Sequence, residues 1–397
     1  MFDTKIEKLN KRERHVFENH FLENGEFVFE GCWLRNQRPE NALRSGYVDE
    51  TTQRRRYIHF YNVYNSVNHN GCWLNLKNYY LYVSNTLPKD ETESYLNKIL
   101  KVLNTSNYVK NGNVYTRGNM EVIINTYDNH PRNKAPYPKN YNSCDIVIHN
   151  KGYDYSQLQD RMWKLSTKMY RIPDKRETPT YIKSASEILP YLPAQIEMGC
   201  GPSIEAGIPP LYEMHETYNV QSHITGKFYF ADQDDLILRI VSDPEKMYRK
   251  FSQTPLNCIK AKHTKGYKTL NKLFQQGAFK GMVYNNNFDR LVKRFNINET
   301  ILRVYDLDNY ITPFVADKDV KSLLCLGCHA DRRQIQKQAR AQGLKVIYID
   351  PEGFFNKDCF EPYPIEGPKN EDFIYKTQFE IAMPEIYKAI KKHNKTK

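Results

Sequence analysis

Residues 199–209 constrain the fold of this chain more than any other stretch of the sequence. A short apolar run, 194–198, leads into Gly199-Cys200-Gly201, and a Gly-Ile-Pro turn closes the stretch. This order is typical of a strand that enters a tight turn and then opens a helix. Such a turn leaves backbone N–H groups free to hold a phosphate, and the helix dipole favours negative charge there. Because a single glycine-rich turn is a weak signal, the rest of the chain has to support it.

The length and composition predict a folded protein of two domains. A chain of 397 residues exceeds the usual size of one domain. Its aromatic content of 13% argues against disorder, since disordered chains contain few aromatic residues. No apolar stretch approaches the ~20 residues of a membrane helix, and the first residues lack the apolar segment of a signal peptide. We therefore expect a cytoplasmic protein.

The eight cysteines are expected to be free thiols, because they are sparse and scattered for a disulfide framework. Cys325 and Cys328 form one Cys-x-x-Cys motif, but no second pair stands at zinc-ribbon spacing. The sequence therefore predicts no metal site.

The net charge of +12 arises from 58 basic and 46 acidic residues. A field of this sign attracts anions, including nucleotides and nucleic acid, although a solvated basic surface would give the same total. The basic residues 54–56 precede the rings of Tyr57, His59, Tyr61 and Tyr64. Basic and aromatic side chains together can bind single-stranded nucleic acid by phosphate contact and stacking. The alternative, which the sequence favours, is a charged turn before a strand with one aromatic face.

Residues 1–175 are predicted to form an N-terminal α+β domain. Apolar residues at helical spacing predict a first helix that runs from about Ile6 to Gly25. Aromatic and β-branched runs predict strands at 26–34, 57–64, 72–83, 113–116, 121–126 and 144–148, with a helix around 96–103. A Pro- and Asn-rich stretch at 127–142 indicates a long loop or linker. A second break at 171–180 places the domain boundary.

Residues 176–397 alternate helices with short buried strands, which is the pattern of a parallel α/β sheet. Helices are expected at 181–189, after Asp243-Pro244, before Gly277 and after Asp331. The expected strands are 194–198, 281–284, 301–307, 322–327 and 345–349, the last of the series.

Four polar or glycine-rich clusters follow these predicted strands: 199–203, 285–289, 327–331 and 350–352. Ligands of parallel α/β sheets bind beyond the carboxyl ends of the strands. All four clusters would therefore lie at one ligand-binding edge. An acidic residue after such a strand can hold the ribose diol of a dinucleotide, which makes Asp350 a candidate.

The order and spacing of these clusters resemble the sirtuin family over about residues 180–393. Sirtuins carry Gly-Ala-Gly-Ile-Ser, three residues and then Gly-Ile-Pro. Here the glycines, Ser203 and the Gly-Ile-Pro of 207–209 stand at that spacing, with Cys200 in place of alanine. The family's Thr-Gln-Asn-Ile-Asp is similar to 285–289, its Gly-Thr-Ser to 327–329, and its late Ile-Asn to Ile349-Asp350. Each motif is degenerate, and the specificity lies in their order.

The resemblance implies a Rossmann-like parallel sheet of six strands, of the sirtuin type, that binds NAD and expels nicotinamide. Asn287 and Asp289 match the residues that position nicotinamide and its ribose. Cys200 is either a reactive thiol beside a helix N-terminus or a small residue in the alanine position. The cofactor-binding residues implied in this way are Gly199, Cys200, Gly201, Pro202, Ser203, Asn286, Asn287, Asp289, Gly327, Cys328, His329 and Asp350.

Three departures from the sirtuin pattern bear on the reaction. Tyr305 stands where the family has its catalytic histidine, and tyrosine, with an unperturbed pKa of about 10, is a poor base near neutral pH. The family's Asp-Phe-Arg is replaced at 210–212, which removes its arginine. No cysteine lies between Tyr305 and Ser322, where the zinc module of sirtuins would stand. That module helps to form the acyl-lysine groove, so its absence argues against deacylation.

The favoured function is cleavage of the nicotinamide–ribose bond of NAD, by hydrolysis or by ADP-ribosyl transfer to an unknown acceptor. Its dissociative transition state needs little general-base help, so preorganised electrostatics around Asn287 and Asp289 could suffice. Tyr305 and His329 complete the set of candidate catalytic residues. The alternatives are a non-catalytic NAD or ADP-ribose module with an N-terminal effector domain, and a divergent deacylase. The acceptor, the role of residues 1–175 and the oligomeric state stay open.

Overall fold

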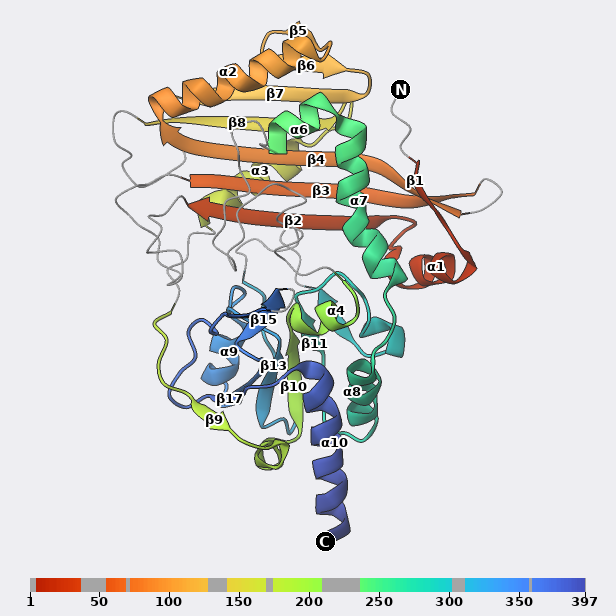
Figure 1. Cartoon of the computed structure of the whole chain (residues 1–397), viewed down its shortest axis with the longest axis vertical. Coiled ribbons are helices and arrows are strands. Elements are labelled where there is room, and N and C mark those ends of the chain that lie inside the picture. The colour runs from red at the N-terminus through yellow and green to blue at the C-terminus, as the bar shows by residue number, and fades with distance from the viewer. Residues whose placement is uncertain are drawn as a thin grey trace. The chain divides into compact units, whose positions relative to one another are not determined.

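The computed structural model describes residues 5–36, 55–68, 72–127, 141–168, 174–208, 236–301, 311–356 and 359–396. The chain divides into two compact units, each with its own sheet (Figure 1). Unit 1 comprises Met1–Ile172, Met214–Gln253 and Val304–Tyr310, and unit 2 comprises Pro173–Glu213, Thr254–Arg303 and Ile311–Lys397.

Unit 1 is built on an antiparallel sheet with eight strands among the described residues. Its order is β2-β3-β4-β8-β7-β6-β5, and β1 pairs with β4. The strands are β1 Lys5–Leu9, β2 Phe27–Asn36, β3 Arg55–Asn68, β4 Cys72–Pro88, β5 Val109–Asn111, β6 Val114–Arg117, β7 Met120–Tyr127 and β8 Tyr141–Asn150. The helices are α1 Lys11–Val16, the π-helical turn η1 Phe17–Phe21, α2 Lys89–Thr105, α3 Ser156–Lys168, α6 Leu236–Ser242 and the part of α7 Pro244–Lys260 that ends at Gln253.

One face of this sheet is apolar and is covered by helices α2, α6 and α7 (Figure 1). Tyr248 of α7 lies against Tyr79, with ring centroids 4.5 Å apart, and Phe251 stacks on Phe60 at 6.5 Å. The sequence assigns the helix after Pro244 to the C-terminal domain, whereas the first part of this helix completes the core of unit 1. The physical reason is that the apolar faces of β3 and β4 must be removed from water, and α7 supplies the rings that cover them.

The opposite face of the sheet buries polar side chains. The Nε2 atom of His59 lies 3.0 Å from Oε1 of Glu30, and both residues are buried. Tyr64, on the apolar face, is fully buried as well. The burial of His59 and Tyr64 removes two of the rings that the nucleic-acid hypothesis needs for stacking, and the side chains of residues 54–57 lie outside the described part of the chain.

We expect Phe251→Ala to lower the free energy of unfolding of unit 1 by about 3 kcal/mol. Phe251 is buried against Phe60, so its truncation loses the hydrophobic transfer free energy of the ring and leaves a cavity. Arg249→Ala is the matched control, since Arg249 is exposed on the same helix, and its loss is expected to cost less than about 0.5 kcal/mol. Urea denaturation followed by circular dichroism measures both, and equal losses would contradict the packing of α7 on this sheet.

Unit 2 is built on a parallel sheet in the order β12-β11-β10-β13-β14-β17-β9. The strands are β9 Thr180–Ile182, β10 Ala194–Met198, β11 Val283–Asn285, β12 Glu299–Ile301, β13 Ser322–Leu326, β14 Lys345–Ile349 and β17 Phe373–Tyr375. A separate hairpin joins β15 Gly353–Asn356 and β16 Cys359–Pro362. The helical segments are η3 Ala185–Tyr191, α4 Gly201–Glu205, the end of α7, α8 Lys265–Gln275, η4 Lys293–Phe295, α9 Ile335–Ala341 and α10 Phe379–Thr396. The prediction of a parallel α/β sheet is confirmed.

The sheet extends beyond the strand that the sequence treats as the last. β17 pairs with β14, and β9 pairs with β17, both in parallel. The described sheet therefore has seven strands, where the resemblance implies six. β9 and β17 are each three residues long, which is too short for alternation or an apolar run to reveal them.

Two predicted helices, at about 6–25 and at 181–189, are helical over only part of their length. Residues Lys5–Leu9 form β1, with Leu9 opposite Cys72 of β4, and a capping box between Asn10 and Glu13 then begins α1. Pairing with β4 overrides the helical spacing because it gives the backbone groups of this short segment their hydrogen-bond partners. Likewise, residues 181–189 contain the end of β9 and most of the 3-10 helix η3.

Candidate functional site

The four clusters meet at one edge of the unit 2 sheet. β10 pairs in parallel with β11 and β13, and β13 pairs in parallel with β14, so the carboxyl ends of these strands are neighbours. The clusters 199–203, 327–331 and 350–352 follow β10, β13 and β14, and 285–289 begins at the last residue of β11. The N–H of Gly199 donates to the Leu326 carbonyl at 2.8 Å, and the N–H of Gly327 donates to the Ile349 carbonyl at 2.9 Å.

The turns after β10 and β13 cross with their backbones in contact. A Cβ on Gly199 would overlap the carbonyl oxygen of Gly327, and a Cβ on Gly327 would lie 2.7 Å from the Cα of Gly201. Gly327 also has a φ of +62°, a conformation that favours glycine. The crossing lies at the reversal of the strand order, because the chain proceeds from β10 to β11 on one side and from β13 to β14 on the other.

On the β11 side of the crossing, buried polar side chains are already paired. The amide of Asn287 donates to the Gly199 carbonyl at 2.5 Å. The hydroxyl of Ser203 donates to Oδ2 of Asp289 at 2.5 Å, and the N–H of Leu291 donates to its Oδ1 at 2.8 Å. Burial raises the pKa of Asp289, and the hydrogen bond from Ser203 opposes that rise. These bonds tie the β11 cluster to the glycine turn.

On the β14 side of the crossing, His329, Asp350 and Tyr363 form a second group. Nδ1 of His329 lies 3.8 Å from Oδ2 of Asp350, and the imidazole stacks on the ring of Tyr363 at an interplanar angle of 16°. The N–H of Glu352 donates to Oδ1 of Asp350 at 2.6 Å. Nε2 of His329 is buried and has no hydrogen-bond partner among the described residues. A buried polar atom of this kind is costly unless water or a ligand pairs with it.

The glycine turn opens a shorter helix than the sequence suggests. α4 contains only Gly201–Glu205, with Pro202 buried in its first turn, so the dipole of α4 supplies little of the field expected there. The backbone N–H groups of Cys200 and Gly201 find no backbone acceptor among the described residues. They, rather than the helix dipole, are the groups that this turn can offer to an anion.

The two thiols of the site both have raised pKa values. Desolvation, followed by the charge of Asp350, raises the pKa of Cys200. The side chain is nevertheless exposed, so both interpretations of Cys200, a reactive thiol and a small residue in the alanine position, stay predictions. Cys328 is buried, and its Sγ lies 3.6 Å from the carbonyl oxygen of Glu197. Burial raises the pKa of Cys328 as well.

Sequence reasoning missed three buried ionisable residues beside the site, Glu197 and the pair Arg290 and Glu299. Glu197 lies inside β10 and is 2% exposed. Arg290 and Glu299 form a buried pair at 3.3 Å, and Glu299 also accepts a hydrogen bond from Asn285. Alternation of Gln195 and Glu197 with apolar residues in β10 is the signal that could have revealed the first. The Arg290–Glu299 pair has no signal in the sequence, since its members meet only through the pairing of β11 with β12.

Some of the predicted site residues cannot be compared with the structure. Tyr305 and residues 210–212 fall outside the described residues, so their places relative to Asn287 and His329 stay predictions. Within the described residues, no group of three or more His, Cys, Asp and Glu side chains is arranged to hold a metal ion. None of the described helices combines the length and the apolar character that crossing a bilayer requires.

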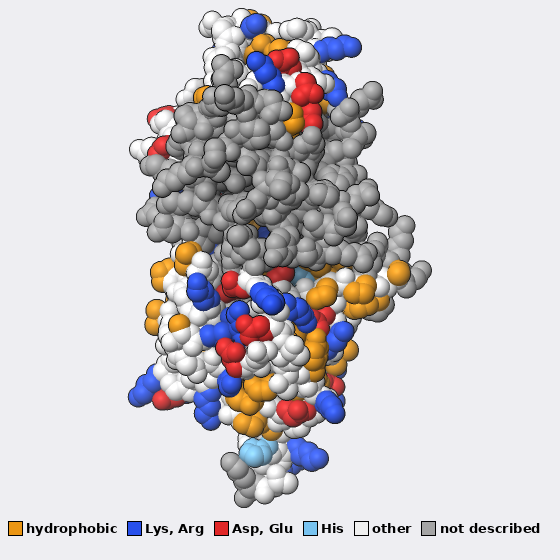
Figure 2. All heavy atoms as spheres, turned by 90° about the vertical axis from the view of Figure 1, so that its left-hand side faces the viewer, with side chains coloured by type: hydrophobic (Ala, Val, Ile, Leu, Met, Phe, Trp, Pro, Cys, Tyr) orange, Lys and Arg blue, Asp and Glu red, His pale blue; other side chains and the backbone are white. Residues whose placement is uncertain are grey.

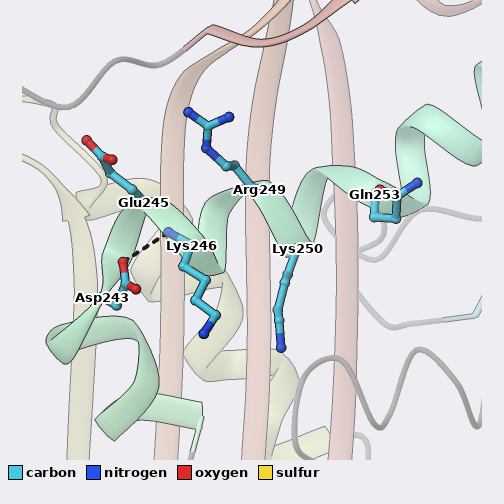
Figure 3. A pocket seen from close by; sticks show the side chains of 6 residues that line it. All are labelled: Asp243, Glu245, Lys246, Arg249, Lys250 and Gln253. Carbon is cyan, nitrogen blue, oxygen red and sulfur yellow. Dashed lines mark hydrogen bonds between the residues drawn. The ribbon is translucent and has the colours of Figure 1, made fainter.

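Two hollows lie away from the glycine turns. One, of about 570 Å³, is on the solvent face of α7 and is lined by Asp243, Glu245, Lys246, Arg249, Lys250 and Gln253 (Figure 3). The other, of about 1240 Å³, lies near the amino ends of β10 and β11 and includes Gln195 and Met282. On the face of unit 2 that Figure 2 shows, basic and acidic side chains are interspersed. A mixed surface of this kind does not mark a single polyanion site on that face.

Comparison with known proteins gives one coarse similarity. No protein-family model matches the sequence, and no curated protein matches it. Three solved structures of Sir2 homologue mutants, each an ADP ribose complex, are similar to 53% of this chain and to 98% of their own chains. Their sequence identity is 13–14% and their TM-scores are 0.36–0.37. This is a weak likeness of fold to Sir2 homologues over about half of the chain.

Proposed function

We propose that unit 2 binds NAD across the carboxyl edge of its parallel sheet and cleaves the bond between nicotinamide and ribose. The observation that carries the proposal is the crossing of the two glycine turns at the reversal of the strand order. Dinucleotides bind at such a point in sheets of Rossmann type, where glycines let the backbone approach the pyrophosphate. The strands β12-β11-β10-β13-β14-β17 follow one another as 3-2-1-4-5-6, which is the Rossmann order.

The two polar groups that flank the crossing suit a long ligand. β11 and β14 are three strand spacings apart, which is about 14 Å at 4.8 Å per spacing. A dinucleotide spans this order of length, with its pyrophosphate over the glycines. Asp350 and His329 would then face the adenosine ribose, and Asn287 and Asp289 would face the nicotinamide ribose.

The chemistry proposed for the Asn287 side is electrostatic. Loss of nicotinamide places positive charge on the ribose, as in glycoside hydrolysis. A fixed carboxylate at Asp289 would stabilise that charge, and Ser203 already holds it in position. Water or another nucleophile would then take the ribosyl group. Tyr305, which lies outside the described residues, remains the candidate for removing a proton from that nucleophile. His329 lies with Asp350 on the β14 side, away from the nicotinamide ribose, so the proposed arrangement does not favour it as the base.

A non-catalytic NAD or ADP-ribose module is the second candidate function. The amide of Asn287 and the carboxylate of Asp289 are both engaged by the scaffold, through Gly199 and Ser203. Groups that hold the turn in shape are sufficient for binding and do not by themselves require a reaction. This observation favours binding alone over deacylation as the alternative.

We expect Asn287→Ala to lower the rate of nicotinamide release from NAD by about 100-fold, the usual effect of losing one positioned donor. Chromatography of nicotinamide and ADP-ribose after incubation with NAD measures this rate. Asn298→Ala is the matched control, since Asn298 is exposed just before β12 and should leave the rate unchanged. NAD binding without nicotinamide release by the wild type would favour the second function, and equal rates in wild type and Asn287→Ala would sink the proposed mechanism.

A further inference from the structure

Glu197 is a buried carboxylate directly beneath the proposed site. It lies in β10, two residues before Gly199, and its side chain is 2% exposed. The hydrophobic core of this part of the sheet includes Leu323, Ile335 and Val346. A charged group in such a place requires hydrogen-bond partners, because its transfer from water is costly.

The partners of Glu197 come from separate elements. Asn286, after β11, donates its amide to Oε1 at 3.2 Å. Gln336 of α9 donates its amide to Oε2 at 2.9 Å, and the Sγ of Cys325 in β13 lies 3.6 Å from the same oxygen. The carboxylate therefore joins β10 to the strands and the helix that surround the glycine turns.

The hydrogen-bond network around Glu197 favours its ionised carboxylate, which can only accept hydrogen bonds. Arg340 can only donate, and its guanidinium donates to the Tyr348 hydroxyl at 2.9 Å. Tyr348 must then donate its own hydrogen to Oε1 of Gln336 at 2.9 Å. The amide group of Gln336 is left to face Glu197 with its N–H. A protonated Glu197 would present a hydrogen to this donor.

Glu197 is connected to the glycine turn through Asn286. The N–H and the amide of Asn286 both contact the Met198 carbonyl, at 2.9 and 3.2 Å. The next residue, Asn287, donates to the Gly199 carbonyl. The same amide that holds Glu197 thus holds the β11 cluster against the turn.

We propose that Glu197 is a positioning residue whose ionised carboxylate holds the Asn286 loop in its ligand-binding shape, so that protonation weakens dinucleotide binding. This inference rests on the proposed function, since it concerns the same site. Protonation removes an acceptor and adds a donor, so the bond with either Asn286 or Gln336 is lost. Asn286 is the exposed partner, with its amide shared between Glu197 and the Met198 carbonyl, whereas Gln336 is buried and held by Tyr348. We therefore expect the bond with Asn286 to be the one that is lost.

Burial and a neighbouring negative charge both act against the ionised form of Glu197 and raise its pKa. Burial, followed by the charge of Asp331, raises the pKa of Glu197 to about 7, against the hydrogen bonds from Gln336 and Asn286. The titratable or charged groups on the packed elements are Cys325, Cys328, Asp331, Arg340, Tyr348 and Asp372. Burial raises the pKa of Cys325, Cys328 and Tyr348, so these groups stay neutral near pH 7. Arg340 and Asp372 form an ion pair at 2.6 Å.

The experiment measures the affinity of the full chain for ADP-ribose by calorimetry between pH 5.5 and 8.5. The ionised form binds better, so we expect affinity to fall by about tenfold as pH decreases through 7, equivalent to one pKa unit between free and bound protein. A rise in affinity toward low pH would contradict the role of Glu197.

Three variants locate the titrating group. Glu197→Gln, which is isosteric, should bind more weakly and without this pH dependence. Asn286→Ala should lose the dependence too, and its exposed position keeps the test valid if Glu197→Gln fails to fold. Glu205→Gln is the matched control, because burial and then Glu380 also raise the pKa of Glu205 to about 7. It should retain the wild-type pH dependence.

The possible results distinguish a failure of the proposed role of Glu197 from a failure of the proposed function of unit 2. Wild-type binding that does not vary with pH overturns the role of Glu197 and leaves the proposed function standing. Persistence of the pH dependence in Glu197→Gln, or its loss in Glu205→Gln, also overturns that role. Absence of ADP-ribose binding at every pH overturns the proposed function itself.

Discussion

Gly327→Ala is expected to lower the free energy of unfolding of unit 2 by about 3 kcal/mol or more and to abolish dinucleotide binding. Two penalties add at this position. A left-handed backbone costs a residue with a Cβ about 1–2 kcal/mol, and Gly327 has a φ of +62°. Overpacking costs about 1–3 kcal/mol, and the new Cβ would lie 2.7 Å from the backbone of Gly201. Neither turn can move aside, because each is hydrogen-bonded to a strand end.

Gly343→Ala is the matched control, because it carries the backbone penalty of a left-handed residue without the overpacking penalty. Gly343 has a φ of +80°, but a Cβ there would meet nothing within 4 Å. We expect it to cost about 1 kcal/mol from the backbone conformation alone, with ADP-ribose affinity unchanged. Urea denaturation gives both values, and calorimetry gives the affinities. If the two glycine variants are equally stable and bind equally well, the turns do not cross as described.

Asp372→Ala is expected to destabilise unit 2 by about 3–5 kcal/mol, the usual result of leaving one member of a buried ion pair alone. Asp372 is fully buried. Its Oδ1 accepts from Nε of Arg340 at 3.0 Å and its Oδ2 from an Nη atom at 2.6 Å, while the Lys369 N–H donates to Oδ2 at 2.7 Å. The substitution leaves the Arg340 guanidinium without its carboxylate partner, and Arg340 is the donor that orients the Tyr348 hydroxyl toward Gln336.

Lys369→Ala is the matched control on the same segment. Its ammonium pairs with Glu177 at 3.2 Å, with both side chains partly exposed, and such pairs contribute less than about 1 kcal/mol. Its backbone N–H, which bonds Asp372, is retained. Chemical denaturation compares the two variants. A loss of less than about 1 kcal/mol in Asp372→Ala would mean that the Arg340–Asp372 pair does not form as described.

The strands of the parallel sheet that are five residues long could be predicted from the sequence, because each carries apolar residues, alternating with polar ones in β10, and is followed by glycine or by polar residues. β10, β13 and β14 fall close to their predicted positions. β11 is three residues long and overlaps its predicted position at 281–284. β9 and β17, of the same length, were not predicted, since their existence depends on pairing with a neighbour. The same reason explains β1, whose apolar residues have helical spacing but whose backbone pairs with β4.

The sequence predicted which polar and glycine-rich clusters lie together at the site, but it did not predict the side-chain contacts between them. The clusters follow buried strands, and parallel pairing makes their ends neighbours whatever the side chains do. The bond between Ser203 and Asp289 joins residues 86 positions apart, and no local pattern specifies it. Tyr363 was missed because it reaches His329 from beyond the hairpin β15–β16.

The sequence by itself determined that a glycine turn at 199–201 and a second at Gly327 would stand at the ligand-binding edge of a parallel sheet. That information is local, since strand-forming runs and glycines act on the backbone around them. Only the tertiary structure decided that the two turns touch, that α7 contributes its rings to unit 1, and that Glu197 is buried among donors. Burial and hydrogen bonding depend on residues far away in the chain, and these set the charge state and position of each polar group.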